Sequence, residues 1–154
     1  MQGNETPAER SDALGERLAS FADRCLTLLQ ALPRNRVGVA NFRDQLARSA
    51  TSVAANYAEA SAPESRKDFA SKMSKALKEA KESRMWLFII SKRGYFAETR
   101  MRPILEEANA IVRILGKSVS TARRGIAGAD GGARTDDGGQ GWTTVDNDGQ
   151  FAPC

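Results

Sequence analysis

Apolar residues recur through residue 124 at the three- and four-residue spacing that is typical of amphipathic helices. The first regular stretch predicts a helix over residues 11–32, which Pro33 ends because proline disfavours the helical conformation of the residue before it. Its apolar positions alternate between spacings of four and three, and they are Leu14, Leu18, Phe21, Cys25, Leu28 and Leu32. Such a stripe lies on one face of a helix and must be buried against a neighbouring element.

Three more helices are predicted by the same pattern. One covers residues 39–60, and small residues between its apolar positions let neighbouring helices approach closely. The next covers residues 62–93, where Ser61 and Glu64 match a capping box, and the last covers residues 98–123. The links between helices are only a few residues long, so consecutive helices pack as antiparallel neighbours. The sequence therefore predicts an all-α fold, an antiparallel up-down-up-down four-helix bundle.

The bundle is expected to occupy residues 11–124, between a flexible N-terminus at residues 1–10 and a long tail at residues 125–154. The tail holds eight of the 13 glycines and almost no aliphatic residues after Ile126. It cannot bury enough apolar surface to offset the entropy that is lost on ordering. We therefore predict that the tail is disordered.

The net charge of +4 is unevenly distributed along the chain. Residues 125–154 contain five acidic residues and one arginine, a net charge of −4, so residues 1–124 carry +8. A basic body of this kind indicates an anionic partner.

Histidine does not occur in the chain, and its absence removes several kinds of chemistry. It excludes nucleophilic sites that pair serine or cysteine with histidine, and the zinc and di-iron sites that use histidine ligands. No phosphate-binding glycine loop is present either. We therefore predict a protein that is not an enzyme and has no metal or cofactor. The polar N-terminus and the lack of a long apolar run predict a cytoplasmic protein without a membrane span.

Basic residues concentrate at one end of the predicted bundle, where the first helix ends, the second begins, and the third meets the fourth. They are Arg34, Arg36, Arg43, Lys92, Arg93, Arg100 and Arg102. Together with the acidic residues Asp44 and Glu98, they give this end a net charge of +5. The opposite end has seven basic and six acidic residues and therefore a net charge of +1. Complementation of the helix dipole explains the cations at the end of the third helix but not the arginines at helix N-termini. We predict that this end binds nucleic acid, with Tyr95 and Phe96 placed to stack on bases.

Several motifs of the second and third predicted helices occur together in one order. They are Asn56-Tyr57-Ala58-Glu59, Ser65-Arg66-Lys67-Asp68-Phe69, Ala76-Leu77-Lys78-Glu79-Ala80-Lys81-Glu82-Ser83, Trp86-Leu87 and Gly94-Tyr95-Phe96. With this order, residues 14–122 resemble the bacterial four helix bundle protein family. The family is also called ribosomal-protein-S23-like, after proteins encoded within intervening sequences of 23S rRNA genes. It is similar in fold to the accessory proteins of diversity-generating retroelements, which form pentameric barrels and bind a reverse transcriptase.

The resemblance implies a homo-oligomer, with a pentamer as the expected form, and a partner such as RNA, DNA, a reverse transcriptase or a ribosome. It also matches Asn56, Glu59 and Glu82 to polar positions of the family. Because buried polar groups must be paired, we interpret these three as an inter-helix hydrogen-bond network rather than a carboxylate site. The chain departs from the common pattern at Ala60 and Glu79, where glycine and serine are usual.

The end of the third predicted helix is apolar nearly all round. A single buried stripe needs only Leu87 and Ile90, yet this part also carries Trp86, Phe88 and Ile89. A surface helix does not show this pattern, so either the fourth helix and the loops cover these side chains or another subunit does. We favour an oligomer interface at these three residues.

Two functions from different classes remain open. The first is a non-enzymatic homo-oligomeric bundle that binds nucleic acid or a nucleoprotein as an accessory factor through its basic end. The alternative is a structural or regulatory oligomer whose ligand is another protein. The concentration of positive charge at one end favours the first.

Overall fold

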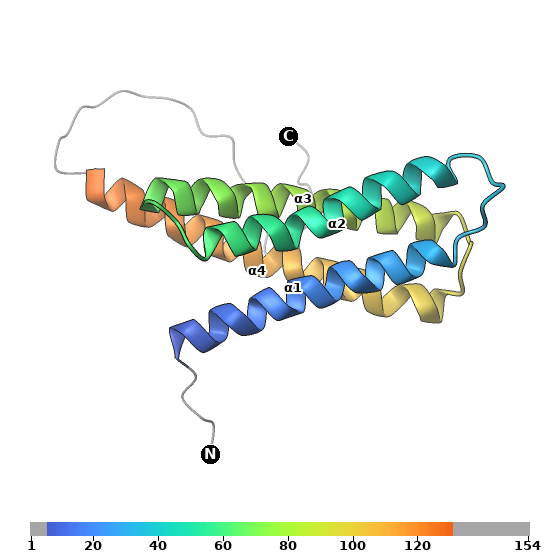
Figure 1. Cartoon of the computed structure of the whole chain (residues 1–154), viewed down its shortest axis with the longest axis horizontal. Coiled ribbons are helices and arrows are strands. Elements are labelled where there is room, and N and C mark those ends of the chain that lie inside the picture. Colours follow the sequence, from blue (N-terminus) through green and yellow to red (C-terminus); the bar gives the residue numbers. More distant parts are fainter. Residues whose placement is uncertain (1–5, 131–154) are drawn as a thin grey trace, which may run out of the picture.

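The computed structural model describes residues 6–130, and these residues form four helices. The helices are α1 (Pro7–Gln30), α2 (Val39–Ala60), α3 (Arg66–Lys92) and α4 (Glu98–Asp130). They run up and down alternately along one long axis (Figure 1). The predicted all-α fold, an antiparallel four-helix bundle, is confirmed, whereas most of the predicted disordered tail lies outside the described residues.

Helix α1 begins one turn earlier than the apolar pattern indicates. The hydroxyl of Thr6 accepts a hydrogen bond from the backbone N–H of Glu9, and the carboxylate of Glu9 accepts one from the backbone N–H of Thr6. This capping box satisfies free N–H groups of the first turn, and Pro7 suits the first helical position. Residues 7–10 are therefore helical, although the sequence analysis assigned them to a flexible N-terminus.

The other helix ends also show where local signals mislead. Helix α3 begins at Arg66 rather than at residue 62, because Ser65 is its N-cap and accepts a hydrogen bond from the N–H of Asp68 at 3.1 Å. Pro63 disfavours a helical conformation at the residue before it, which delays the helix. Helix α4 continues to Asp130, seven residues past its expected end at 123, since Gly125 and Gly128 weaken a helix without stopping it.

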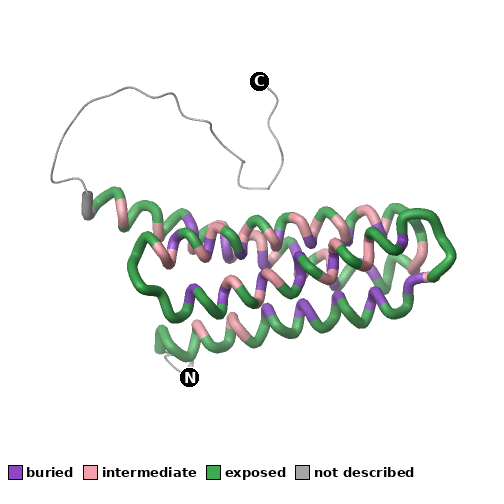
Figure 2. The backbone as a smooth tube through the Cα atoms, turned by 45° about the horizontal axis from the view of Figure 1, so that its top comes forward, coloured by how far each residue is buried: buried purple, intermediate pink, exposed green. Residues whose placement is uncertain are grey.

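The core is a single apolar cluster along the bundle axis (Figure 2). Each helix contributes one stripe, and the largest fully buried side chains are Phe21, Leu18, Leu46, Met73, Leu87, Ile90, Met101, Ile111 and Leu115. Between α2 and α3 the core holds a polar pair, in which the hydroxyl of Ser83 donates to that of Ser49 at 2.9 Å. No helix within residues 6–130 is both long enough and apolar enough to cross a membrane.

The connections place two loops together at one end of the bundle. Residues 31–38 join α1 to α2, and residues 93–97 join α3 to α4, at the right-hand end in Figure 1. Gly38 and Gly94 have φ angles of 83° and 67°, a left-handed conformation that favours glycine and lets each loop turn sharply. The α2–α3 connection lies at the opposite end, so the end with two loops is the one where basic residues were expected to gather.

Candidate nucleic-acid interface

Six of the seven predicted nucleic-acid-binding residues lie exposed at the two-loop end. Arg34 and Arg36 lie in the α1–α2 connection. Lys92 ends α3, and Arg93 follows it in the α3–α4 connection. Arg100 and Arg102 lie at the start of α4. The six cations share this end with the exposed carboxylates of Asp44 and Glu98, so the exposed groups have a net charge of +4. The structure thus brings together side chains that are up to 68 residues apart in sequence (34 to 102).

Arg43 differs from the other six because its side chain points into the bundle. It is half-buried, and its guanidinium donates a hydrogen bond to the backbone carbonyl of Leu32, in the turn that leaves α1. Its Nε atom is buried and has no hydrogen-bond partner among the described residues. Arg43 therefore holds the start of α2 to the end of α1, a role that the charge count alone did not reveal.

Little of the remaining positive charge is neutralised within the chain. Arg102 lies 3.3 Å from Glu98 in an exposed pair one helical turn apart. Arg34, Arg36 and Arg93 form no ion pair with any residue of the described chain. Positive charge near the N-termini of α2 and α4 is unfavourable, so helix stability does not account for it.

Two aromatic rings accompany these cations. The guanidinium carbon of Arg100 lies 4.6 Å from the centre of the Phe96 ring, and the ammonium of Lys92 lies 5.2 Å from the centre of the Phe88 ring. Both distances fit cation–π contacts. Tyr95 is half-buried against the core, and its buried hydroxyl has no hydrogen-bond partner within residues 6–130, so it is less accessible to a base than the sequence suggested.

A groove between α3 and α4 opens beside this end. It has a volume of about 380 Å³ and is lined by Lys81, Arg84, Met85, Phe88, Leu105 and Asn109. Phe88 and Met85 are 53% and 46% exposed, which is unusual for large apolar side chains. Sequence analysis missed the groove because its two walls come from different helices.

The three predicted interface residues do not share one surface. Trp86 packs on Phe42 of α2 with ring centres 6.1 Å apart, and its Nε1–H donates to the carboxylate of Glu82. Ile89 is half-buried, whereas Phe88 is exposed. Trp86 is thus covered within the chain by α2, whereas the alternative above named the fourth helix and the loops. The oligomer interface itself stays a prediction.

The predicted polar network is also divided. Asn56 donates to the carbonyl of Ser52 within α2, and Glu82 accepts from Trp86 within α3. Glu59 is exposed and faces Lys72 of α3 at 3.8 Å. No hydrogen bond in the described chain joins the three. The buried inter-helix polar contact is that between Ser49 and Ser83, and Ser83 lies four residues before Leu87 on the buried face of α3.

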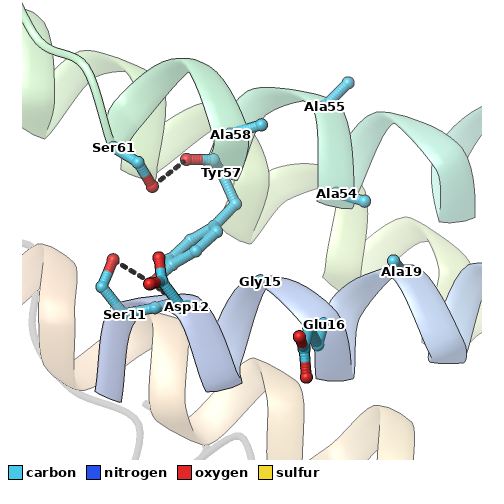
Figure 3. A pocket seen from close by; sticks show the side chains of 10 residues that line it. All are labelled: Ser11, Asp12, Gly15, Glu16, Ala19, Ala54, Ala55, Tyr57, Ala58 and Ser61. Atoms are coloured by element: carbon cyan, nitrogen blue, oxygen red, sulfur yellow. Dashed lines mark hydrogen bonds between the residues drawn. The ribbon is translucent and has the colours of Figure 1, made fainter. Parts of the chain in front are cut away.

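A second, larger groove of about 740 Å³ lies between α1 and α2 at the other half of the bundle (Figure 3). Small residues of both helices line it, and the hydroxyl of Tyr57 crosses it to donate to the carbonyl of Ser11 at 3.0 Å. Asp12 and Glu16 are the charged residues of its lining. This groove is therefore acidic, and it does not suit a phosphate.

Comparison with known proteins gives a consistent picture. Residues 16–117 match the family model described as "23S rRNA-intervening sequence protein". A crystal structure of a protein of unknown function from the S23 ribosomal protein family of Bacteroides thetaiotaomicron is similar, with a TM-score of 0.63 and 28% sequence identity. The similarity covers 71% of this chain and 97% of that one. No curated protein matches the sequence.

Proposed function

The chain belongs to the 23S rRNA-intervening sequence protein family, and on this premise we propose that it binds nucleic acid or a nucleoprotein through its basic end. The family's name and the description of its Bacteroides member indicate no catalytic activity, which is consistent with a non-enzymatic accessory role. RNA, DNA, a reverse transcriptase with its nucleic acid, or a ribosome would each offer the phosphates that such a surface needs.

The observation that carries the proposal is the exposed charge at the two-loop end. Six cations on three separate segments lie there with two carboxylates, and Arg34, Arg36 and Arg93 have no anionic partner in the described chain. Like charges brought together repel one another, so this arrangement lowers the stability of the isolated protein. A bound polyanion neutralises these charges and so removes their repulsion. The release of its counterions also favours binding.

Charge reversal tests the proposal. The triple variant Arg34→Glu, Arg36→Glu, Arg93→Glu is compared with Arg66→Glu, Lys75→Glu, Lys117→Glu, which changes the net charge equally at exposed positions elsewhere. Binding to duplex DNA is measured by fluorescence anisotropy over a range of salt concentrations. Each lost phosphate contact reduces the magnitude of the slope of log K (the binding constant) against log salt concentration by about 0.9. The first variant, which loses three cations, should therefore reduce this magnitude by up to about 2.7.

The outcomes separate the candidate functions. Loss of binding in the first variant only supports the basic end as the site. Equal losses in both variants mean that net charge alone attracts the DNA. If the wild-type protein does not bind nucleic acid at low salt, the alternative of a structural or regulatory oligomer with a protein ligand replaces this proposal. The α1–α2 groove favours that alternative because it has a volume of about 740 Å³ and is lined mainly by small residues.

We also propose that copies of the chain associate, with a pentamer as the form that the family resemblance implies. Met85 and Phe88 are too small a surface for a stable interface, which buries on the order of 1,200 Å² or more, so other surfaces have to contribute. Light scattering at micromolar concentration should give a multiple of 16.7 kDa. A monomeric mass under these conditions would reject self-association without affecting the nucleic-acid proposal.

A further inference from the structure

The α3–α4 groove combines an exposed ring, a polar amide and cations. Phe88 presents its ring at 53% exposure, and the aliphatic side chains of Met85 and Leu105 lie beside it. Asn109 contributes an exposed amide from α4. Burying an exposed ring against a flat apolar surface is favourable, and an amide can both donate and accept hydrogen bonds. These are the groups that hold a planar heterocycle.

The side of α3 that borders the groove carries lysines on both sides of its apolar residues. Lys78, Lys81, Met85, Phe88 and Lys92 follow at spacings of three, four, three and four residues, so they form one exposed stripe. No acidic residue belongs to this stripe. Glu82 flanks the stripe, four residues after Lys78 and three before Met85, and its carboxylate accepts the hydrogen bond of Trp86. The stripe therefore complements a polyanion that runs along the helix.

Lys92 connects this stripe with the basic end. It is the last residue of α3, and its ammonium lies 5.2 Å from the centre of the Phe88 ring. Arg93 follows directly at the two-loop end. A chain of phosphates bound at that end can therefore continue along α3, past Phe88 and Met85, to Lys81 and Lys78.

We propose that the α3–α4 groove binds the unpaired bases of a single-stranded nucleic acid, whose phosphates lie along the α3 stripe. The proposal rests on the nucleic-acid function proposed above and adds the type of strand to it. In a duplex the base faces are covered by their neighbours, so they cannot stack on Phe88. In a single strand each base has a free face, and stacking on an aromatic side chain depends little on sequence.

The test compares strand types on the full chain. Anisotropy is measured with a single-stranded oligonucleotide of about 16 nucleotides, near the upper site size of compact single-strand binders, and with the duplex of the same sequence. Phe88→Leu keeps an apolar side chain but removes the ring, and Phe88→Tyr restores the ring. Leu26→Met is the control, because it changes an exposed apolar side chain on α1, outside the groove. All of these positions are exposed, and thermal melting confirms that the variants fold.

Phe88→Leu should weaken single-strand binding by between about fivefold and a hundredfold, the range for loss of one stacked base. Duplex binding should stay unchanged in this variant, and Phe88→Tyr and Leu26→Met should bind the single strand as the wild type does. An equal effect on single strand and duplex, or no effect on either, would overturn the groove proposal and leave the basic end as the binding site. A lower mass in light scattering with an unchanged strand preference would also overturn it, because Phe88 then lies between copies of the chain. Absence of any wild-type binding would refute the proposed function itself.

Discussion

Replacing Arg43 by alanine tests the distinction between a structural and a nucleic-acid-binding arginine. Arg43 and Arg36 are both positively charged and lie seven residues apart, yet only Arg43 is half-buried and bonded to the carbonyl of Leu32. Arg43→Ala should therefore destabilise the fold and leave nucleic-acid binding intact. Arg36→Ala should weaken nucleic-acid binding and leave the stability of the fold unchanged, because the Arg36 side chain is exposed and forms no ion pair within the described chain.

The expected loss of stability in Arg43→Ala follows from the groups that lose their hydrogen-bond partners. A hydrogen bond from a charged donor contributes about 1.5–3 kcal/mol when it is buried. Arg43 is partly exposed, and its replacement by alanine also removes a buried Nε that has no partner within the described residues. The expected loss of unfolding free energy is therefore smaller, about 1–2 kcal/mol. The entropy of unfolding is about 2.1 cal/mol/K for each ordered residue, so this loss should lower the melting temperature by about 4–8 °C. Arg36→Ala should change the unfolding free energy by less than about 0.5 kcal/mol.

Urea unfolding and salt-dependent anisotropy on both variants give the decisive comparison. Arg36→Ala should lower the slope of log K against log salt by about 0.9, and Arg43→Ala should leave that slope unchanged. An unchanged unfolding midpoint together with a reduced salt slope in Arg43→Ala would refute the structural role. Arg43 would then be a phosphate ligand, as its place in the sequence first indicated.

Three further predictions concern contacts within the bundle. The hydrogen bond from Arg17 lowers the pKa of Glu107, so the stabilising contribution of Glu107 is present above its usual pKa and is lost as the pH falls through the lowered value. Glu107→Gln should therefore destabilise the protein at neutral pH by up to about 1 kcal/mol, and urea unfolding should show that this difference disappears in acid. Burial raises the pKa of the Cys25 thiol to about 12, so in a Cys154→Ser variant iodoacetamide should modify Cys25 only after unfolding; modification of the native protein would contradict its burial. Ser83→Ala removes the buried hydroxyl bonded to Ser49 and should cost about 1–2 kcal/mol in urea unfolding, more than Ser118→Ala, whose partly buried hydroxyl bonds only within α4. Equal costs for the two serine variants would show that the inter-helix bond contributes nothing.

The sequence by itself determined the helices, their order and the residues of the core. The three- and four-residue spacing identified Leu18, Phe21 and Leu87 as buried, because only one face of an amphipathic helix can meet its neighbours. Short links forced antiparallel packing, and this placed Arg34 and Arg100 at the same end although they are far apart in the chain. Helix ends were less accurate, since capping bonds such as that of Ser65 depend on backbone geometry as well as on residue type.

Only the tertiary structure decided which side chains at that end are free to bind. Periodicity gives the direction in which a side chain leaves its helix, but not what lies there. Arg43 meets a carbonyl of α1, and Trp86 meets Phe42 of α2, so both are engaged within the chain. Phe88, two residues after Trp86, stays 53% exposed at the groove between α3 and α4, where Lys92 lies over its ring. The α3–α4 groove has the same origin, since a concave surface between two helices depends on how far apart their axes lie, and no single stretch of sequence encodes that distance.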